Sequence, residues 1–156
     1  MSTIVPGIQA EQDAVWWQGS LFRIKGRGMK TAGAIGLVEA NYYAGFSPPL
    51  HVHHREDEAW YILEGELRCR RGDEEFTARV GDFVFCPREI PHSFKALDGG
   101  ARALLLAIPA GLEEMFLEGG VPVRDPAQPP PKEFDIERVR ALARKYGFDV
   151  IGPPLV

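Results

Sequence analysis

Short stretches of alternating apolar and polar residues follow one another from residue 16 to about residue 109. Such alternation is typical of strands, in which every second side chain lies on the same face. Turn signals rich in glycine, such as Arg71-Gly72-Asp73 and Asp98-Gly99-Gly100, separate the stretches. About eight short strands at near-regular spacing predict an all-β fold, a closed antiparallel barrel or jelly roll. The predicted strands are Leu21–Gly26, Ala34–Tyr43, Leu50–His54, Glu58–Leu67, Glu74–Val80, Asp82–Cys86, His92–Leu97 and Ala101–Ile108.

After Pro109 the apolar residues follow helical spacing instead. Leu112, Met115 and Phe116 predict a first short helix, which ends at the glycine pair 119–120. Residues 121–133 hold five prolines and predict an extended strap. Asp135 is a good N-cap for a second helix, which Gly147 closes. We expect one or two helices here, packed on the outside of the barrel through an apolar stripe. The stripe of the second helix is Ile136, Val139, Leu142, Ala143 and Tyr146.

The chain is therefore divided into three parts: a loose N-terminal arm over 1–15, the β-barrel over 16–109 and a C-terminal helical extension over 110–156. A length of 156 residues suits a single domain. The 17 glycines and 13 prolines favour a fold with many tight turns, as all-β proteins have.

Charge and hydropathy exclude two classes of partner. The formal net charge is −4, and no basic run is longer than Arg70-Arg71, which argues against nucleic-acid binding. No apolar stretch approaches the roughly 18 residues of a membrane span, and the N-terminus lacks the features of a leader. We therefore expect a cytoplasmic protein. Cys69 and Cys86 are too few for a disulfide scaffold and are expected to be reduced and buried.

All four histidines fall between residues 51 and 92. On a strand, His51 and His53 project side by side, whereas His54 points away. Glu58 opens the next predicted strand and His92 comes from a later segment. Three histidines and a carboxylate suit one divalent transition metal ion, such as Fe, Mn, Ni, Co, Cu or Zn, and leave coordination positions open for catalysis.

The acidic pair Glu56 and Asp57 has two interpretations. The simpler one is a solvated turn between two strands. In the other, a turn that differs by one residue would bring one of these carboxylates to the ligand position.

The spacing of these residues resembles the two sequence motifs of the cupin superfamily. The first motif is matched in register by Gly45, His51, His53, Glu58 and Gly65, and the second by Gly81, Pro87 and His92. Two positions depart from the second motif, because Glu89 stands where it has glycine and Ala96 where it has asparagine. The resemblance covers residues 20–108 and implies a double-stranded β-helix that holds a metal with His51, His53, Glu58 and His92.

Further segments resemble bacterial single-domain cupins related to quercetin dioxygenases. These segments are Trp16–Gly19, Thr31–Gly33, Pro48–His51 and Glu56–Tyr61. This resemblance implies a dioxygenase of a phenolic or enolic, flavonol-like compound, with O₂ as co-substrate and Glu58 as the base. Two alternatives stay open: a metal-dependent isomerase or epimerase of a sugar or keto acid, and a non-catalytic small-molecule-binding module.

Parity along the strands indicates which side chains line the substrate pocket. Trp60 and Ile62 share the parity of Glu58, and Phe94 shares that of His92, so all three should point inward. Tyr43 and Phe85 are further candidates for the wall. Plain core packing is the alternative for all five, since barrel interiors are filled by large apolar side chains. Exposed edge strands and the N-terminal arm also predict a homodimer.

Overall fold

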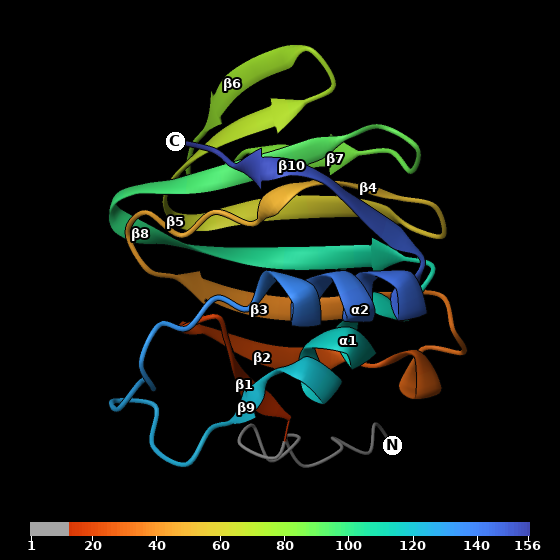
Figure 1. Cartoon of the computed structure of the whole chain (residues 1–156), viewed down its shortest axis with the longest axis vertical. Coiled ribbons are helices and arrows are strands. Elements are labelled where there is room, and N and C mark those ends of the chain that lie inside the picture. Colours follow the sequence, from red (N-terminus) through yellow and green to blue (C-terminus); the bar gives the residue numbers. More distant parts are fainter. Residues whose placement is uncertain (1–12) are drawn as a thin grey trace, which may run out of the picture.

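The computed structural model describes residues 13–156, and it shows an antiparallel β-fold with two helices (Figure 1). The prediction of an all-β fold is confirmed. The strands are β1 (Ala14–Trp17), β2 (Ser20–Gly26), β3 (Gly36–Tyr42), β4 (Pro49–His53), β5 (Asp57–Arg71), β6 (Glu74–Ala78), β7 (Phe83–Cys86), β8 (His92–Ile108), β9 (Val121–Pro122) and β10 (Phe148–Pro154). The helices are α1 (Leu112–Gly119) and α2 (Ile136–Tyr146), with a 3-10 turn at Gly28–Lys30.

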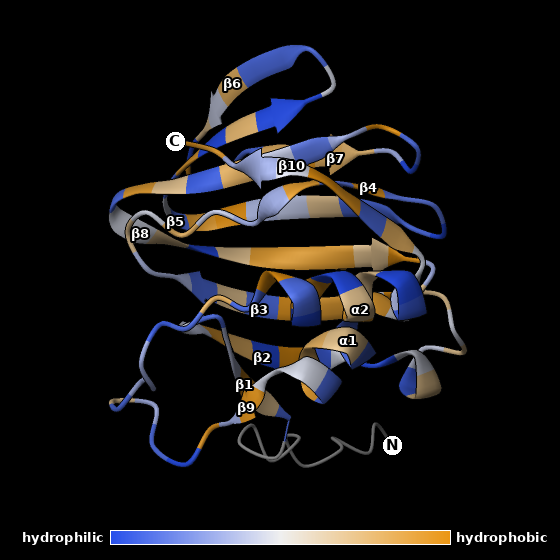
Figure 2. Ribbon diagram, in the orientation of Figure 1, coloured by the Kyte–Doolittle hydropathy of each residue, from blue (hydrophilic) through white to orange (hydrophobic). Residues whose placement is uncertain are grey.

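The two longest strands, β5 and β8, pair with each other, and each also pairs with two further strands. The sheet runs β10-β4-β8-β3-β2-β1-β9, and β5 pairs with β6, β7 and β8. The inward positions of β8 include the small side chains of Ala103 and Ala107. They flank Leu105, which pairs with Trp60 of β5, and so leave room for the large indole ring. Apolar residues gather along the second half of β8, while the tip of the β5–β6 hairpin and the strap before α2 are mostly hydrophilic (Figure 2).

The predicted turn at Asp98–Gly100 does not end a strand. β8 continues through it, and the register with β5 shifts between Gly65 and Leu67. At this bend the two backbones approach closely, because a Cβ on Gly65 would meet the carbonyl oxygen of Gly100. Only glycine, with a φ of 72° here, fits the position without strain.

The N-terminal boundary of the barrel was predicted too late in the chain. Residues 1–12 of the expected arm lie outside the described residues. Ala14 and Val15, however, belong to β1, where they are buried and pair with Arg23 and Phe22 of β2. The sheet therefore begins before residue 16.

Both predicted helices are present, and their caps are the expected ones. The Asp135 carboxylate accepts hydrogen bonds from the backbone N–H groups of Glu137 and Arg138, and Gly147 ends α2 with a φ of 79°. The prediction of a β-fold with C-terminal helices is therefore confirmed. The Phe116 ring of α1 packs 4.7 Å from the Phe22 ring of β2, so α1 packs against the sheet.

The C-terminal extension is not only helical. After α2 the chain forms β10, which pairs antiparallel with β4 and places Phe148 beside His53 and Val150 beside His51. The last strand of the chain therefore supports the strand that carries two of the four candidate ligands.

Two smaller expectations concern the thiols and membrane spans. Cys69 and Cys86 are free and buried, as predicted. Within residues 13–156, no helix is long and apolar enough to cross a membrane.

Candidate metal centre

The structure brings His51, His53, Glu58 and His92 together inside the barrel. One ligand atom from each lies within 4.8 Å of those of the other three, and all four residues are buried. β4 supplies His51 and His53 from one face, β5 supplies Glu58, and β8 supplies His92 directly across from His51. Three strands that are separate in sequence thus converge on one point.

In each of the three histidines, the Nδ1 atom lies close to an oxygen atom that is not part of the four-residue cluster. The Nδ1 atoms of His51, His53 and His92 lie 2.6, 2.5 and 3.3 Å from Pro49 O, Glu56 Oε1 and Ile90 O. Because these oxygens accept hydrogen bonds, they favour the tautomer with a proton on Nδ1. The Nε2 lone pairs are then free to face the shared centre, as in metal sites whose histidines are oriented by hydrogen-bonded partners.

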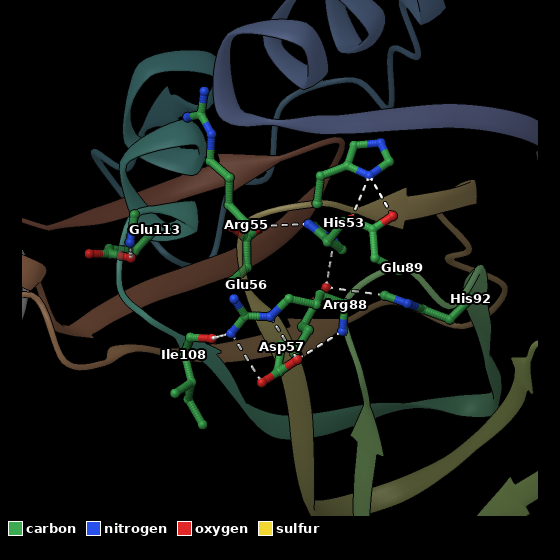
Figure 3. Close-up of polar contacts among 12 residues, drawn as sticks. His53, Arg55, Glu56, Asp57, Arg88, Glu89, His92, Ile108 and Glu113 are labelled. Carbon is green, nitrogen blue, oxygen red and sulfur yellow. Dashed lines mark hydrogen bonds and ion pairs between the residues drawn. The ribbon is translucent and has the colours of Figure 1, made fainter.

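Glu58 occupies the middle of the cluster. Its Oε2 lies 2.7 Å from Nε2 of His53 and 3.1 Å from Nε2 of His92, and Figure 3 shows both rings reaching one carboxylate oxygen. The His53 contact lacks hydrogen-bond geometry, so this buried nitrogen has no hydrogen-bond partner. An orphaned imidazole nitrogen beside a carboxylate and two further imidazoles is the donor set that a divalent transition metal ion prefers.

The protonation of the cluster follows from burial and mutual charge. Burial, reinforced by the two other histidines, lowers the pKa of His51 to about 3. Burial also acts to lower the pKa of His53, but Glu58 and Glu56 outweigh it and raise this pKa to about 9. Burial acts to raise the pKa of Glu58, yet His53 and His92 lower it overall. The carboxylate of Glu58 is therefore ionised at neutral pH.

Glu56 is a residue of the site that the sequence analysis did not predict in this role. It was interpreted as part of a solvated turn, yet it is 4% exposed and contacts Nδ1 of His53. It is not one of the four converging ligands, so the alternative of a ligand role is not supported by its position. Its neighbour Asp57 faces outward and pairs with Arg88 (Figure 3).

A cavity opens above the cluster, with His51, His53 and Glu58 in its wall. Its volume is about 60 Å³, which is room for roughly four water molecules. The wall is otherwise mainly apolar, and α1 and α2 contribute to it. Among the described residues no lysine or arginine lines it. Its aromatic members are Trp17, Phe22, Tyr42, Phe46, Phe94, Phe116 and Phe148.

The structure places the five predicted pocket residues in different surroundings. Phe94 lines the cavity. Trp60 and Ile62 point inward as expected but are buried in the core and do not line it. Tyr43 lies outside, in a surface hollow, and its neighbour Tyr42 takes the place in the wall.

The prediction for Phe85 is wrong, because its side chain lies on the outer face of β7 and is 39% exposed. The inward positions of β7 are Val84 and Cys86, which pair with Trp60 and Glu58.

The barrel strands that carry the cluster match a known family. The model of the cupin domain matches residues 38–109, which include all four candidate ligands. Residues 38–109 of this chain thus form a cupin domain. The resemblance in the sequence motifs is thereby confirmed, and the departures at Glu89 and Ala96 leave the convergence of the four side chains intact.

Curated relatives include a quercetin 2,3-dioxygenase from Bacillus subtilis. It is 25% identical over 140 residues, which are 86% of this chain and 42% of that protein. The chain spans less than half the length of the curated relatives it matches.

Solved structures show the same fold. KdgF from Halomonas sp. gives a TM-score of 0.55 at 20% identity and covers 61% of this chain and 83% of that chain. A variant of the oxalate decarboxylase OxdC from Bacillus subtilis gives a TM-score of 0.54 at 26% identity, over 63% of this chain and 27% of that chain. Both structures share the fold of this chain, and a shared fold does not fix the activity.

Proposed function

We propose that this chain is a metal-dependent enzyme that acts on a small organic molecule, with dioxygenase chemistry on a phenolic or enolic, flavonol-like compound and O₂ as co-substrate. The observation that carries the proposal is the buried set of three histidines and one glutamate at one end of an aromatic cavity. The similarity to quercetin 2,3-dioxygenases supports it.

In this proposal His51, His53, Glu58 and His92 hold one divalent transition metal ion. When bound, the ion would polarise the substrate oxygen and make its hydroxyl group more acidic. Glu58 is the general base: its carboxylate lies in the cavity wall beside the histidines, where it can accept the hydroxyl proton that the ion would make more acidic.

Tyr42 supplies a hydrogen-bond donor in the same cavity. Its oxygen accepts a hydrogen bond from Nε1 of Trp60 at 3.2 Å, which leaves its own proton to donate. Burial raises the pKa of this hydroxyl, so it stays protonated at neutral pH. The mainly aromatic wall suits a planar apolar substrate.

The cavity chemistry also ranks the alternatives. A keto acid carries a carboxylate, which arginine or lysine usually binds, and a sugar carries many hydroxyl groups, which a mainly apolar wall does not match. The described cavity wall contains neither arginine nor lysine. A metal-dependent isomerase or epimerase of such a substrate is therefore the second candidate, and a non-catalytic binding module is the third.

The test compares turnover with and without O₂. The protein is loaded with each of Fe, Mn, Ni, Co, Cu and Zn in turn and mixed with a panel of flavonols and enediols in an oxygen electrode. We expect O₂ consumption that tracks bound metal and stops after chelation. Activity unchanged under strict anaerobiosis would instead identify an isomerase, and tight ligand retention without turnover would identify a binding module.

We also propose a homodimer, because aromatic side chains are exposed on the outer face of β5 and β7. Tyr61 and Phe83 are 42% and 60% exposed there, beside Phe85. Exposed aromatic patches of this kind commonly mark protein interfaces. Light scattering should give about twice the chain mass of 17.3 kDa, and Phe83→Glu should shift the protein to monomer. A wild-type mass of one chain would contradict the dimer.

A further inference from the structure

Gln18 lies where the interior cavity approaches the surface. Gln18 lines the cavity that three of the candidate ligands also line, and it lines two surface hollows as well. One hollow lies against Pro130 and Arg138, and the other against Tyr43 and Lys132. Because these three spaces share Gln18, its side chain stands at the mouth through which a ligand would pass.

The local backbone does not explain why this position is a glutamine. Trp17 pairs with Ser20, so Gln18 and Gly19 form a two-residue hairpin loop, with φ values of 49° and 83°. A loop with two positive φ values is a type I′ turn, which favours asparagine, aspartate or glycine at its first position. Glutamine gains nothing in this turn, and a side chain kept at a strained backbone position indicates a function of that side chain.

The chemistry of the side chain complements the rest of the wall. Among the described residues that line the cavity, Gln18 is the one that carries a carboxamide. A carboxamide both donates and accepts hydrogen bonds, so it can recognise a hydroxyl or a carbonyl group without adding charge. The cavity therefore has a polar end at His51, His53 and Glu58, an aromatic middle and a second polar group at its mouth.

We propose that Gln18 is a specificity-determining residue, which binds a polar group on the end of the substrate remote from the four-residue cluster. This inference rests on the proposed function and narrows its substrate class to planar apolar molecules with oxygen groups at both ends. A site that hydrogen-bonds such a group discriminates against the analogue that lacks it.

The test uses two metal-binding probes that differ only at the remote end. They are 3-hydroxypyran-4-one and the same ring with a hydroxymethyl group on the carbon opposite the enol. Both are titrated into Co²⁺-loaded protein and followed by absorbance. The wild type should bind the hydroxymethyl probe about 5-fold more tightly, the contribution of one neutral hydrogen bond.

Variants of the turn separate recognition from folding. Gln18→Gly suits the positive φ, so its thermal midpoint should equal or exceed that of the wild type while the affinity ratio of the two probes falls to about 1. Gln18→Asn also suits the turn but is one methylene shorter, and it should lose most of the ratio. Tyr43→Phe, in the neighbouring hollow, is the matched control and should keep it.

The outcomes distinguish the two proposals. If neither probe binds the wild type, the proposed function fails, and this inference fails with it. If both probes bind and Gln18→Gly keeps the wild-type ratio, only the role of Gln18 is overturned. A lower thermal midpoint with equally weakened binding of both probes would also overturn it, because Gln18 would then serve the turn alone.

Discussion

The candidate ligands and the wall of the cavity come from different parts of the chain. All four ligands lie within residues 38–109, the part that matches the cupin domain. Much of the wall comes from outside it: Trp17 and Gln18 precede it, and residues of α1, α2 and β10 follow it. In the proposed function, the shared barrel would hold the metal ion, whereas the flanking segments would determine which molecule fits the cavity.

The largest effect is expected for the base in the ligand region. Glu58→Gln keeps the shape of the side chain but removes the charge that accepts the substrate proton. Turnover should fall about 100-fold or more, as is typical when a general base is lost. The measurement is O₂ consumption with the active flavonol or enediol, and the protein should still retain part of its metal. Full activity would remove Glu58 from the base role.

The next effect is expected for Glu56, which orients His53 without being one of the four converging residues. Glu56→Ala should weaken metal affinity about 10- to 100-fold, the usual cost of losing such a partner. A competition titration with a chelating dye measures it. Asp57→Ala is the control, because Asp57 pairs with Arg88 on the outer surface. Equal affinities in the two variants would contradict the role of Glu56.

A change in the wall should leave metal content unaltered. The Phe148 ring of β10 lies 4.9 Å from the ring of His53, yet it donates no ligand atom. Phe148→Leu should cost about 1 kcal/mol of unfolding free energy, or a few degrees in thermal midpoint. Metal per chain should stay at the wild-type value. A loss of metal comparable to that of a ligand variant would remove the distinction between the two regions.

The smallest effect concerns the helix that covers the cavity. Asp135 caps α2 through two backbone N–H groups, and Asp135→Ala should cost about 1 kcal/mol. Urea unfolding followed by circular dichroism measures the change. Asp125→Ala, in the preceding strap, is the control and should have little effect. An unfolding free energy of Asp135→Ala that equals the wild-type value would show that α2 holds its place without this cap.

The convergence of the ligand residues could be predicted from sequence because local geometry fixes it. His51 and His53 share a face through the two-residue repeat of a strand, and a short turn brings Glu58 back beside them. His92 lies far from these residues in the sequence, and it was added to the predicted ligand set because its spacing resembles the second cupin motif.

The wall could not be predicted in the same way. The apolar run Ala34–Tyr43 shows no alternation that would distinguish Tyr42 from Tyr43. β10 contains Gly152, Pro153 and Pro154, which argue against a strand in sequence. Phe85 is apolar yet faces outward, so hydrophobicity alone gave the wrong face.

Glu56 was missed for the opposite reason, since a charged residue in a turn normally faces solvent. Only the three-dimensional contact with His53 compensates its burial. The alternation of residues along a strand predicts which side chains share a face of that strand. It does not predict that a side chain in the following turn will contact the ring of a histidine on the strand.

The account depends most directly on metal bound by the four-residue cluster. The decisive measurement is elemental analysis of the wild type, His53→Ala and His54→Ala, each purified without added metal. His54 is the matched control, because it lies next to His53 but faces outward toward Glu89 and Asp149. We predict about one divalent transition metal ion per chain in the wild type and in His54→Ala, and a sharp loss in His53→Ala. Equal metal content in all three proteins, or none in the wild type, would contradict the account.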